Sequence, residues 1–272
     1  DTFKKLGCEV FPLYCDLDGN FPNHHPDPSR PENLEDLISE VKRSNLDIGL
    51  AFDGDADRIG VISPKGEIIY PDMQMIIFAE SILKNSPKAK IVFDVKCSKL
   101  LSESIINNNG QPIMCKTGHT FIKETLRNES ALLGGEMSGH IFFNDRWPGF
   151  DDGIYAAARM LEIISEYEEG FDIFSKLPSL YSTPEINLPS TDDDKFKIVE
   201  SFKNSYNFPD ANLIDIDGVR LEFPEGWGLL RASNTSPVVV LRFEAESNEA
   251  LENIKNKFKG ILRTIDLQLG DF

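Results

Sequence analysis

The stretch ENLEDLISEVKRSNLDIGLAFDGDADRIGVIS, residues 32–63, decides the fold of the first part of the chain. Residues 32–45 predict an amphipathic helix, because apolar residues recur at i, i+3, i+4 and i+7. These residues are Leu34, Leu37, Ile38 and Val41. The apolar run over 46–52 then predicts a buried strand. Since LGCEVFPLY, residues 6–14, also has the pattern of a strand, we expect a strand–helix–strand unit, which usually has parallel strands.

Three aspartates follow this strand at every second position, and a cation comes directly after them. They are Asp53, Asp55 and Asp57, followed by Arg58. Like charges this close repel one another, so the cluster needs a counter-charge. Carboxylate oxygens two residues apart can converge on a divalent cation such as Mg²⁺, and Arg58 beside a metal would suit a second anion such as phosphate. A solvated acidic turn remains an alternative.

An EF-hand does not fit this stretch. With Asp53 as position 1, position 6 is Arg58 instead of glycine, and position 12 is Pro64 instead of glutamate. The end of a strand is nevertheless where open α/β sheets bind ligands, so the aspartates stand at a plausible site for a bound metal.

The rest of the chain divides into two patterns. RIGVIS and EIIY surround the turn PKGE and predict a hairpin. Helical and strand patterns then alternate as far as about residue 167, which predicts a second α/β block. From about residue 184, short strands in series between helices predict an antiparallel α+β domain.

Other polar stretches offer candidate binding groups. Glu136, Ser138 and His140 alternate, so in an extended segment they would point to one side and suit a polyol such as a sugar, although an exposed strand face would look the same. His119 stands where a strand ends and a helix begins, which suits an anion, and Lys96 stands at a comparable strand end. Either residue could instead be structural.

The segment RASNTSP lies between two predicted strands and combines a forked cation with several donors. Its candidate phosphate ligands are Arg231, Ser233, Asn234 and Thr235. An ordinary turn rich in serine, threonine and asparagine is the alternative.

Composition limits the classes of partner. The 272 residues carry a formal net charge of −17, which argues against nucleic acid and anionic membranes, because both bind basic surfaces. No apolar run reaches about 18 residues, and the first residues do not resemble a signal peptide. Four cysteines without C-x-x-C spacing indicate reduced thiols, so we expect a cytoplasmic protein.

Taken together, FDGDADRIGV, GEMSGHIFF and RASNTSPVVVLRFEA resemble the α-D-phosphohexomutases. GNFPNHHPDPSRPENL, DVKCSKLL, CKTGHTFIKE and RWPGFDDGIYAAARMLEII resemble the bacterial phosphomannomutase/phosphoglucomutase branch of that family. The resemblance implies two α/β domains, the first incomplete, and a C-terminal α+β domain with an antiparallel sheet. The expected boundaries are 1–67 with the metal-binding loop, 68–180 with the sugar-binding loop, and 181–272 with the phosphate-binding loop.

The resemblance also implies a reaction. Family members interconvert hexose 1-phosphate and hexose 6-phosphate through a phosphoserine enzyme and a 1,6-bisphosphate. The phosphoserine lies in a loop like T-A-S-H-N-P, which this sequence lacks, so we expect the chain to be inactive alone. The implied partners are mannose and glucose 1- and 6-phosphates and their 1,6-bisphosphates.

Residue roles follow from the same resemblance. The implied Mg²⁺ ligands are Asp53, Asp55 and Asp57. The implied catalytic residues are Arg58, Lys96 and His119. The implied substrate ligands are Glu136, Ser138 and His140 for the sugar, and Arg231, Ser233, Asn234 and Thr235 for a phosphate.

Two other functions stay open. A haloacid-dehalogenase-type phosphatase has a D-x-D motif after an apolar strand and a later acidic pair, which AFDGDAD and GFDDG resemble. However, Asp57 stands where that motif has threonine or valine, and no apolar strand precedes Asp151 and Asp152. The second alternative is a non-catalytic module that binds sugar phosphates.

Overall fold

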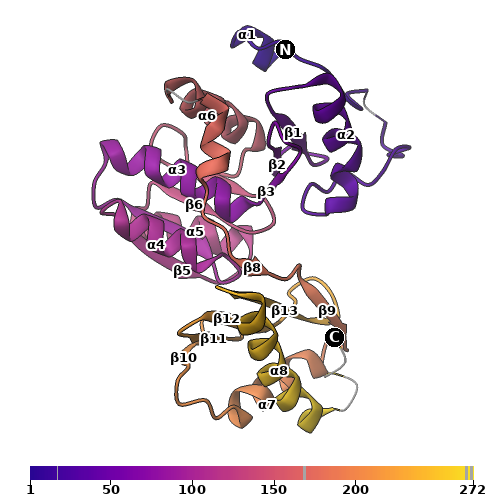
Figure 1. Ribbon diagram of the computed structural model, residues 1–272, viewed down its shortest axis with the longest axis vertical. Coiled ribbons are helices and arrows are strands. Elements are labelled where there is room, and N and C mark those ends of the chain that lie inside the picture. Colours follow the sequence, from indigo (N-terminus) through magenta and orange to yellow (C-terminus); the bar gives the residue numbers. More distant parts are fainter. Residues whose placement is uncertain (17, 168–169, 267–268, 270–271) are drawn as a thin grey trace. The chain divides into compact units, whose positions relative to one another are not determined.

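A computed structural model describes residues 1–16, 18–167, 170–266, 269 and 272. The chain forms two compact units, Asp1–Leu177 and Pro178–Phe272 (Figure 1). Within the described residues, no helix combines the length and the apolar character needed to cross a membrane. The mixed α/β architecture and the antiparallel sheet of the second unit confirm the predicted fold class.

A small antiparallel sheet opens the first unit. Its strands are β1 (Gly49–Phe52), β2 (Ile59–Ile62) and β3 (Ile68–Ile69), in the order β1-β2-β3. The 3-10 helix η1 (Pro31–Leu34) and helix α2 (Glu35–Ser44) pack on this sheet. The predicted apolar face of this helical segment is confirmed, because Leu34 and Val41 are buried against Ile62. The predicted hairpin is also confirmed, since Ile62 pairs with Ile68.

The predicted strand over 6–14 is wrong, and so is the parallel strand–helix–strand unit. Helix α1 (Thr2–Lys5) is followed by irregular backbone, and Leu6, Phe11 and Tyr14 are 57%, 50% and 48% exposed. Such side chains gain little from pairing with a sheet. The strand β1 pairs instead with β2, and the six-residue loop between them is too short for the crossover that parallel strands require.

A second, larger sheet follows in the same unit. Its strands are β4 (Lys90–Asp94), β5 (Gln111–Cys115), β6 (Leu133–Gly135) and β7 (Ile141–Phe143), in the order β5-β4-β6-β7. The central strand β4 is parallel to β5 and β6, and β7 is antiparallel to β6. Parallel neighbours need helical crossovers, and these are supplied by α4 and α5.

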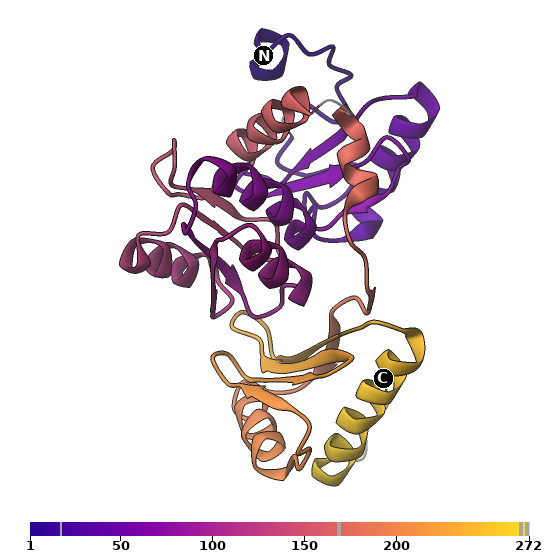
Figure 2. The ribbon, with the colours of Figure 1, turned by 60° about the vertical axis from the view of Figure 1, so that its left-hand side comes forward.

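Helices cover both faces of this sheet (Figures 1 and 2). They are α3 (Pro71–Asn85), α4 (Lys99–Asn107), α5 (His119–Glu129) and α6 (Gly153–Glu166), followed by the 3-10 helix η2 (Gly170–Lys176). Along β4, Ile91 and Phe93 face the core formed with α3, α4 and α6, whereas Val92 faces α5. Ile59 and Val61 of β2 belong to the first of these cores, so the two sheets share one apolar interior.

The second unit is an antiparallel sheet with helices packed against it. The strands are β8 (Tyr181–Ser182), β9 (Ile186–Pro189), β10 (Asn212–Ile214), β11 (Val219–Phe223), β12 (Gly226–Ala232) and β13 (Val238–Ala245), and the helices are α7 (Asp194–Ser205) and α8 (Asn248–Ile265). The core joins both helices to the strands through aromatic rings, since Phe258 of α8 lies 4.8 Å from Phe202 of α7 and 5.1 Å from Phe243 of β13 between ring centroids. Just before α7, the hydroxyl of Thr191 accepts a hydrogen bond from Asp194 N, the first residue of the helix, at 3.1 Å.

Gly228 of β12 allows α8 to approach the sheet. A Cβ at this position would lie 2.6 Å from Cε2 of Phe258 and 2.9 Å from Cδ1 of Phe243. We therefore expect Gly228→Ala to lower the free energy of unfolding by about 1–3 kcal/mol, because aromatic rings in a packed core cannot retreat freely. Urea denaturation of the whole chain measures the change.

The matched control is Gly260→Ala in α8. No atom lies within 4 Å of a Cβ built at Gly260, so this change should raise stability by about 0.5–1 kcal/mol through helix propensity alone. A Gly228→Ala protein as stable as the Gly260→Ala protein would show that the close approach is unimportant.

Candidate active site

The acidic loop, residues 53–58, connects β1 to β2 and is held by its own side chains. Arg58 donates from its backbone N to Asp53 Oδ1 (3.1 Å) and from Nε to Asp53 Oδ2 (2.7 Å). Its Nη1 donates to Asp27 Oδ1 at 2.9 Å. Arg58 thus ties the loop both to its first aspartate and to the segment before α2.

The three predicted metal ligands come together in this loop. Asp53, Asp55 and Asp57 each offer one oxygen, and these oxygens all lie within 4.8 Å of one another. Although burial opposes it, hydrogen bonds from Arg58 lower the pKa of Asp53. Burial raises the pKa of Asp57, and the charges of Asp53 and Asp55 raise it further. The loop therefore concentrates negative charge that a cation would relieve.

Backbone hydrogen bonds join the acidic loop to the Glu136 turn, residues 136–140, between β6 and β7. Ile59 N donates to Gly139 O at 3.1 Å, and Arg58 and His140 form an isolated antiparallel bridge. Gly139 has a φ of 101°, and a Cβ there would lie 2.9 Å from Ile59 O. Only glycine suits that backbone and that contact. The relative position of the two segments is consequently set by main chain.

The side chains of the Glu136 turn form one network, although not in the way the sequence suggested. The predicted extended segment is wrong, because residues 136–139 make a turn closed by Gly139 N donating to Glu136 O at 3.0 Å. Within the turn, Ser138 Oγ donates to Glu136 Oε1, and His140 Nδ1 donates to the same oxygen at 2.7 Å. The three predicted side chains are thus brought together by a turn and its hydrogen bonds.

The hydrogen bonds of this network lower the pKa of Glu136 and raise the pKa of His140. Burial opposes ionisation of Glu136, but hydrogen bonds from His140 and Ser138 lower its pKa to about 2. Burial likewise opposes protonation of His140, but Glu136 and then Asp57 raise its pKa. His140 Nε2 lies 3.3 Å from Asp57 Oδ1. The His140 ring therefore links the Glu136 turn to the acidic loop in addition to the backbone contacts.

Lys96 lies beside a buried carboxylate that was not among the predicted site residues. Asp94, the last residue of β4, is fully buried, and its Oδ2 lies 4.0 Å from Lys96 Nζ and 2.9 Å from the donating Oγ1 of Thr117. Burial raises the pKa of Asp94. Lys96 also contributes to the low pKa of Glu136, so it belongs to the same cluster. The sequence signal that could have identified Asp94 is its position as an acidic residue at the end of an apolar strand.

His119 lies beside a second carboxylate that was not among the predicted site residues. Its Nδ1 lies 3.2 Å from Asp151 Oδ2, and Asp151 Oδ1 accepts from Lys123 Nζ at 2.9 Å. The side chain of His119 is 51% exposed at the start of α5, and its ring centroid lies 5.4 Å from that of His140. Asp152, the other half of the acidic pair in GFDDG, accepts from Tyr155 N and caps α6.

The second unit holds the remaining predicted ligands in the Arg231 loop, residues 231–236, between β12 and β13. Arg231 is buried, and its Nε donates to Asp217 Oδ2 at 2.9 Å. Ser233 Oγ accepts from the backbone N of Thr235 at 3.4 Å and of Ser236 at 3.2 Å. Asn234 and Thr235 are exposed. Among the described residues, Arg231 Nη2 is buried and has no hydrogen-bond partner.

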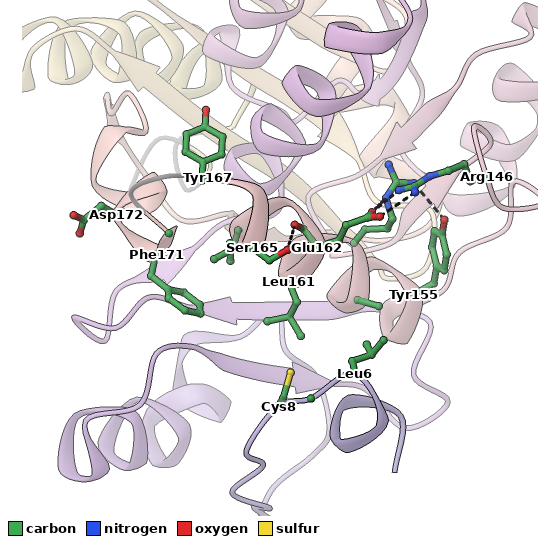
Figure 3. A pocket seen from close by; sticks show the side chains of 15 residues that line it. Leu6, Cys8, Arg146, Tyr155, Leu161, Glu162, Ser165, Tyr167, Phe171 and Asp172 are labelled. Atoms are coloured by element: carbon green, nitrogen blue, oxygen red, sulfur yellow. Dashed lines mark hydrogen bonds and ion pairs between the residues drawn. The ribbon is translucent and has the colours of Figure 1, made fainter.

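A hollow of about 1110 Å³ lies elsewhere in the first unit, between α6, η2 and the segment after α1 (Figure 3). Leu6, Cys8, Leu161 and Phe171 are among its lining residues, and Arg146 pairs with Glu162 at its wall. None of the predicted site residues lines it. The hollow is therefore separate from the candidate site.

Three family models match the chain in succession. Phosphoglucomutase/phosphomannomutase, alpha/beta/alpha domain II, matches residues 1–66, and alpha/beta/alpha domain III matches residues 70–181. The C-terminal domain of the same family matches residues 185–261. The matches together cover most of the chain and include the acidic loop, the Glu136 turn and the Arg231 loop.

Individual relatives agree with these matches. The chain is 54% identical to a phosphomannomutase/phosphoglucomutase of Pseudomonas aeruginosa over 267 residues, which is 98% of this chain and 58% of the relative. It is 51% identical to a phosphoglucomutase of Neisseria gonorrhoeae over 264 residues, 96% of this chain and 57% of that relative.

A solved structure gives the same answer in three dimensions. The phosphoglucomutase/phosphomannomutase family protein of Burkholderia thailandensis is 49% identical and superposes with a TM-score of 0.91, covering 96% of this chain and 56% of that one. The chain thus spans somewhat more than half the length of these relatives. The family models, the relatives and the superposition agree, and the chain belongs to the phosphoglucomutase/phosphomannomutase family.

Proposed function

We propose that this chain binds metal, sugar and phosphate in an enzyme that interconverts hexose 1-phosphate and hexose 6-phosphate, with mannose or glucose as the sugar. The observation that carries the proposal is the joining of the acidic loop to the Glu136 turn by main chain and by His140. Such a junction puts metal ligands beside groups that recognise hydroxyls. The names of the Pseudomonas and Neisseria relatives support the same reaction.

Asp53, Asp55 and Asp57 are the proposed ligands of Mg²⁺. The donor set fits this ion, because Mg²⁺ prefers hard oxygen ligands and is often bound through carboxylates together with substrate phosphate. When bound, the ion would neutralise charge that develops during phosphoryl transfer. Arg58 would add positive charge beside it while remaining anchored on Asp53 and Asp27.

Glu136 and Ser138 are the proposed readers of sugar hydroxyls. Because Glu136 stays ionised, it can accept hydrogen bonds from a hydroxyl over the whole neutral range of pH. His140 donates a hydrogen bond to it and Lys96 lowers its pKa, and His119 stands at the N-terminus of α5, where anions are stabilised. We propose that Lys96 and His119 contact the substrate during the reaction.

Arg231, Ser233, Asn234 and Thr235 are the proposed phosphate ligands of the second unit. A buried arginine is expected to use all its hydrogen-bond donors. Among the described residues Nη2 of Arg231 has no acceptor, which favours a bound ligand as its partner. Phosphate oxygens accept in the forked geometry of a guanidinium. The exposed Asn234 and Thr235 can add donors from the same loop.

The phosphoryl relay itself is proposed to use a phosphoserine and a 1,6-bisphosphate, as the family resemblance implies. The printed sequence has no stretch like T-A-S-H-N-P. The donor would therefore come from outside these 272 residues, and the chain alone would bind hexose phosphates without converting them.

A haloacid-dehalogenase-type reaction would need Asp53 as a free nucleophile. Both of its carboxylate oxygens instead accept hydrogen bonds from Arg58, and Asp152 of the later acidic pair caps a helix. These contacts favour the mutase. A non-catalytic module that binds sugar phosphates remains the second candidate, supported by the missing serine loop.

Calorimetry and a coupled assay test the function. We expect the chain to bind glucose 1-phosphate and mannose 1-phosphate but not free glucose, and to give no turnover even with glucose 1,6-bisphosphate. Turnover by the chain would contradict the missing relay, and equal heats from glucose and its phosphate would contradict the function. Turnover by the product of the whole open reading frame would decide for the mutase over the binding module.

Asp55→Asn tests the metal ligands. Asp55 is exposed, so its loss removes a metal ligand and one like charge without opening the core. We expect the variant without metal to melt at the same temperature as the parent or slightly higher, and to lose most of the rise in melting temperature that Mg²⁺ gives the parent. Asp47→Asn, also exposed and just before β1, is the control and should keep the full rise. An unchanged Mg²⁺ effect in Asp55→Asn would exclude Asp55 as a ligand.

Arg231→Ala tests the phosphate ligands. A charge-assisted hydrogen-bonded contact is worth about 1.5–3 kcal/mol, so we expect the calorimetric Kd for glucose 6-phosphate to rise roughly 10- to 150-fold. Arg231→Lys should be intermediate, because it keeps the charge and loses the fork. Arg263→Ala, an exposed change in α8, is the control and should bind normally. Normal binding by a folded Arg231→Ala protein would remove Arg231 from the site.

A further inference from the structure

Two histidines and two aspartates of the first unit face one another where the acidic loop meets the second sheet. Asp57, His119, His140 and Asp151 each offer one ligand atom, and these atoms all lie within 4.8 Å of one another. They come from the acidic loop, the first turn of α5, the Glu136 turn and the segment before α6. This donor set contains nitrogen, unlike the three aspartates proposed for Mg²⁺.

Two of the separations between these atoms are close to those of a tetrahedral site. Zinc bonds of about 2.0–2.1 Å place neighbouring ligand atoms about 3.3–3.5 Å apart in a tetrahedron. The observed separations are 3.3 Å for His140 Nε2 to Asp57 Oδ1, 3.9 Å for His140 Nε2 to Asp151 Oδ2, and 3.2 Å for His119 Nδ1 to Asp151 Oδ2. Small side-chain movements would close the set around one ion.

The imidazole of His140 is already oriented for a metal. Its Nδ1 donates to Glu136 Oε1 at 2.7 Å, which leaves Nε2 directed at Asp57 and Asp151. Metal-binding histidines usually make such a hydrogen bond from the other ring nitrogen to a carboxylate. Glu136 is itself fixed, because its second oxygen accepts from Gly118 N at 3.0 Å.

Asp151 is likewise held with one oxygen available. Lys123 Nζ donates to Oδ1 at 2.9 Å, and Oδ2 faces both histidines. The main chain also supports the arrangement, since Gly153 N donates to Ala56 O at 2.9 Å and so joins the segment after Asp151 to the acidic loop. His140 and Asp151 are therefore held by partners, Glu136 and Lys123, that do not depend on a bound ion.

We infer that Asp57, His119, His140 and Asp151 form a second metal site that takes a borderline transition-metal cation such as Zn²⁺ or Co²⁺. Imidazole nitrogen favours these ions, whereas Mg²⁺ prefers oxygen donors alone. Asp57 belongs to both donor sets, so the second site competes with the first for this carboxylate. That consequence rests on the proposed function; the binding of the transition metal does not.

Cobalt spectroscopy of the purified chain tests the site without any measurement of turnover. Four-coordinate Co²⁺ absorbs visible light intensely and six-coordinate Co²⁺ only weakly, so we expect an intense band that saturates at one ion per chain. His119→Ala and Asp151→Asn should each weaken Co²⁺ binding at least ten-fold, and Glu136→Gln should weaken it by about 10- to 100-fold by releasing His140. His119 is half exposed, so its removal should leave the chain folded.

Two controls use other residues of this chain. The double variant His24→Ala/His25→Ala removes the remaining two histidines and should keep the band and the affinity. Asp55→Asn removes a ligand of the Mg²⁺ set alone and should also keep both. Circular dichroism confirms that each variant is folded.

Several results would overturn the inference. These are the absence of an intense band, a weak six-coordinate spectrum that Asp55→Asn abolishes, and a sulfur-to-cobalt charge-transfer band, which would place the ion on cysteine. Loss of the band in the His24→Ala/His25→Ala variant, or its full retention in folded His119→Ala and Asp151→Asn variants, would do the same.

Discussion

The candidate site of the first unit depends on main-chain hydrogen bonds that join the acidic loop and the start of β2 to segments about 80 and about 97 residues later in the sequence. Ile59 N, directly after the acidic loop, donates to Gly139 O in the Glu136 turn, and Gly153 N, at the start of α6, donates to Ala56 O in the loop itself. Backbone contacts of this kind do not depend on side-chain rotamers. The carboxylates of one segment and the imidazole of the other are therefore held in register before any ligand binds, which lowers the entropy that binding must overcome.

The shared interior gives these hydrogen bonds their rigidity. Ile59 follows the acidic loop directly and is buried in the same core as Phe93 of β4 and Ala157 of α6. Moving the loop away from the Glu136 turn would therefore also expose apolar side chains. Each Å² of apolar surface exposed to water costs roughly 25 cal/mol of free energy, so separating the two sheets would be unfavourable. Polar positioning at the site thus rests on apolar packing beneath it.

How far the sequence predicted this arrangement depends on the range of the interactions. The helix that buries Val41 and the hairpin around residues 63–67 follow from local spacing and turn residues, and both are found. The strand over 6–14 fails because a strand needs a partner, which local pattern does not supply. The sequence offered Asp151 only as part of an acidic pair and not as a partner of His119, since His119 lies 32 residues away and only the tertiary fold brings them together.

The three aspartates have different surroundings, which their regular spacing in the sequence does not predict. Asp53 is committed to Arg58, Asp57 faces His140, and Asp55 is exposed. Each carboxylate oxygen can accept more than one hydrogen bond or metal bond, so these commitments fix the direction of Asp53 and Asp57 without exhausting their lone pairs. A hard cation would then need to recruit only Asp55 from water. Arg58 and the ring of His140, which orient two of the ligands, also offset the repulsion between these carboxylates in the absence of metal.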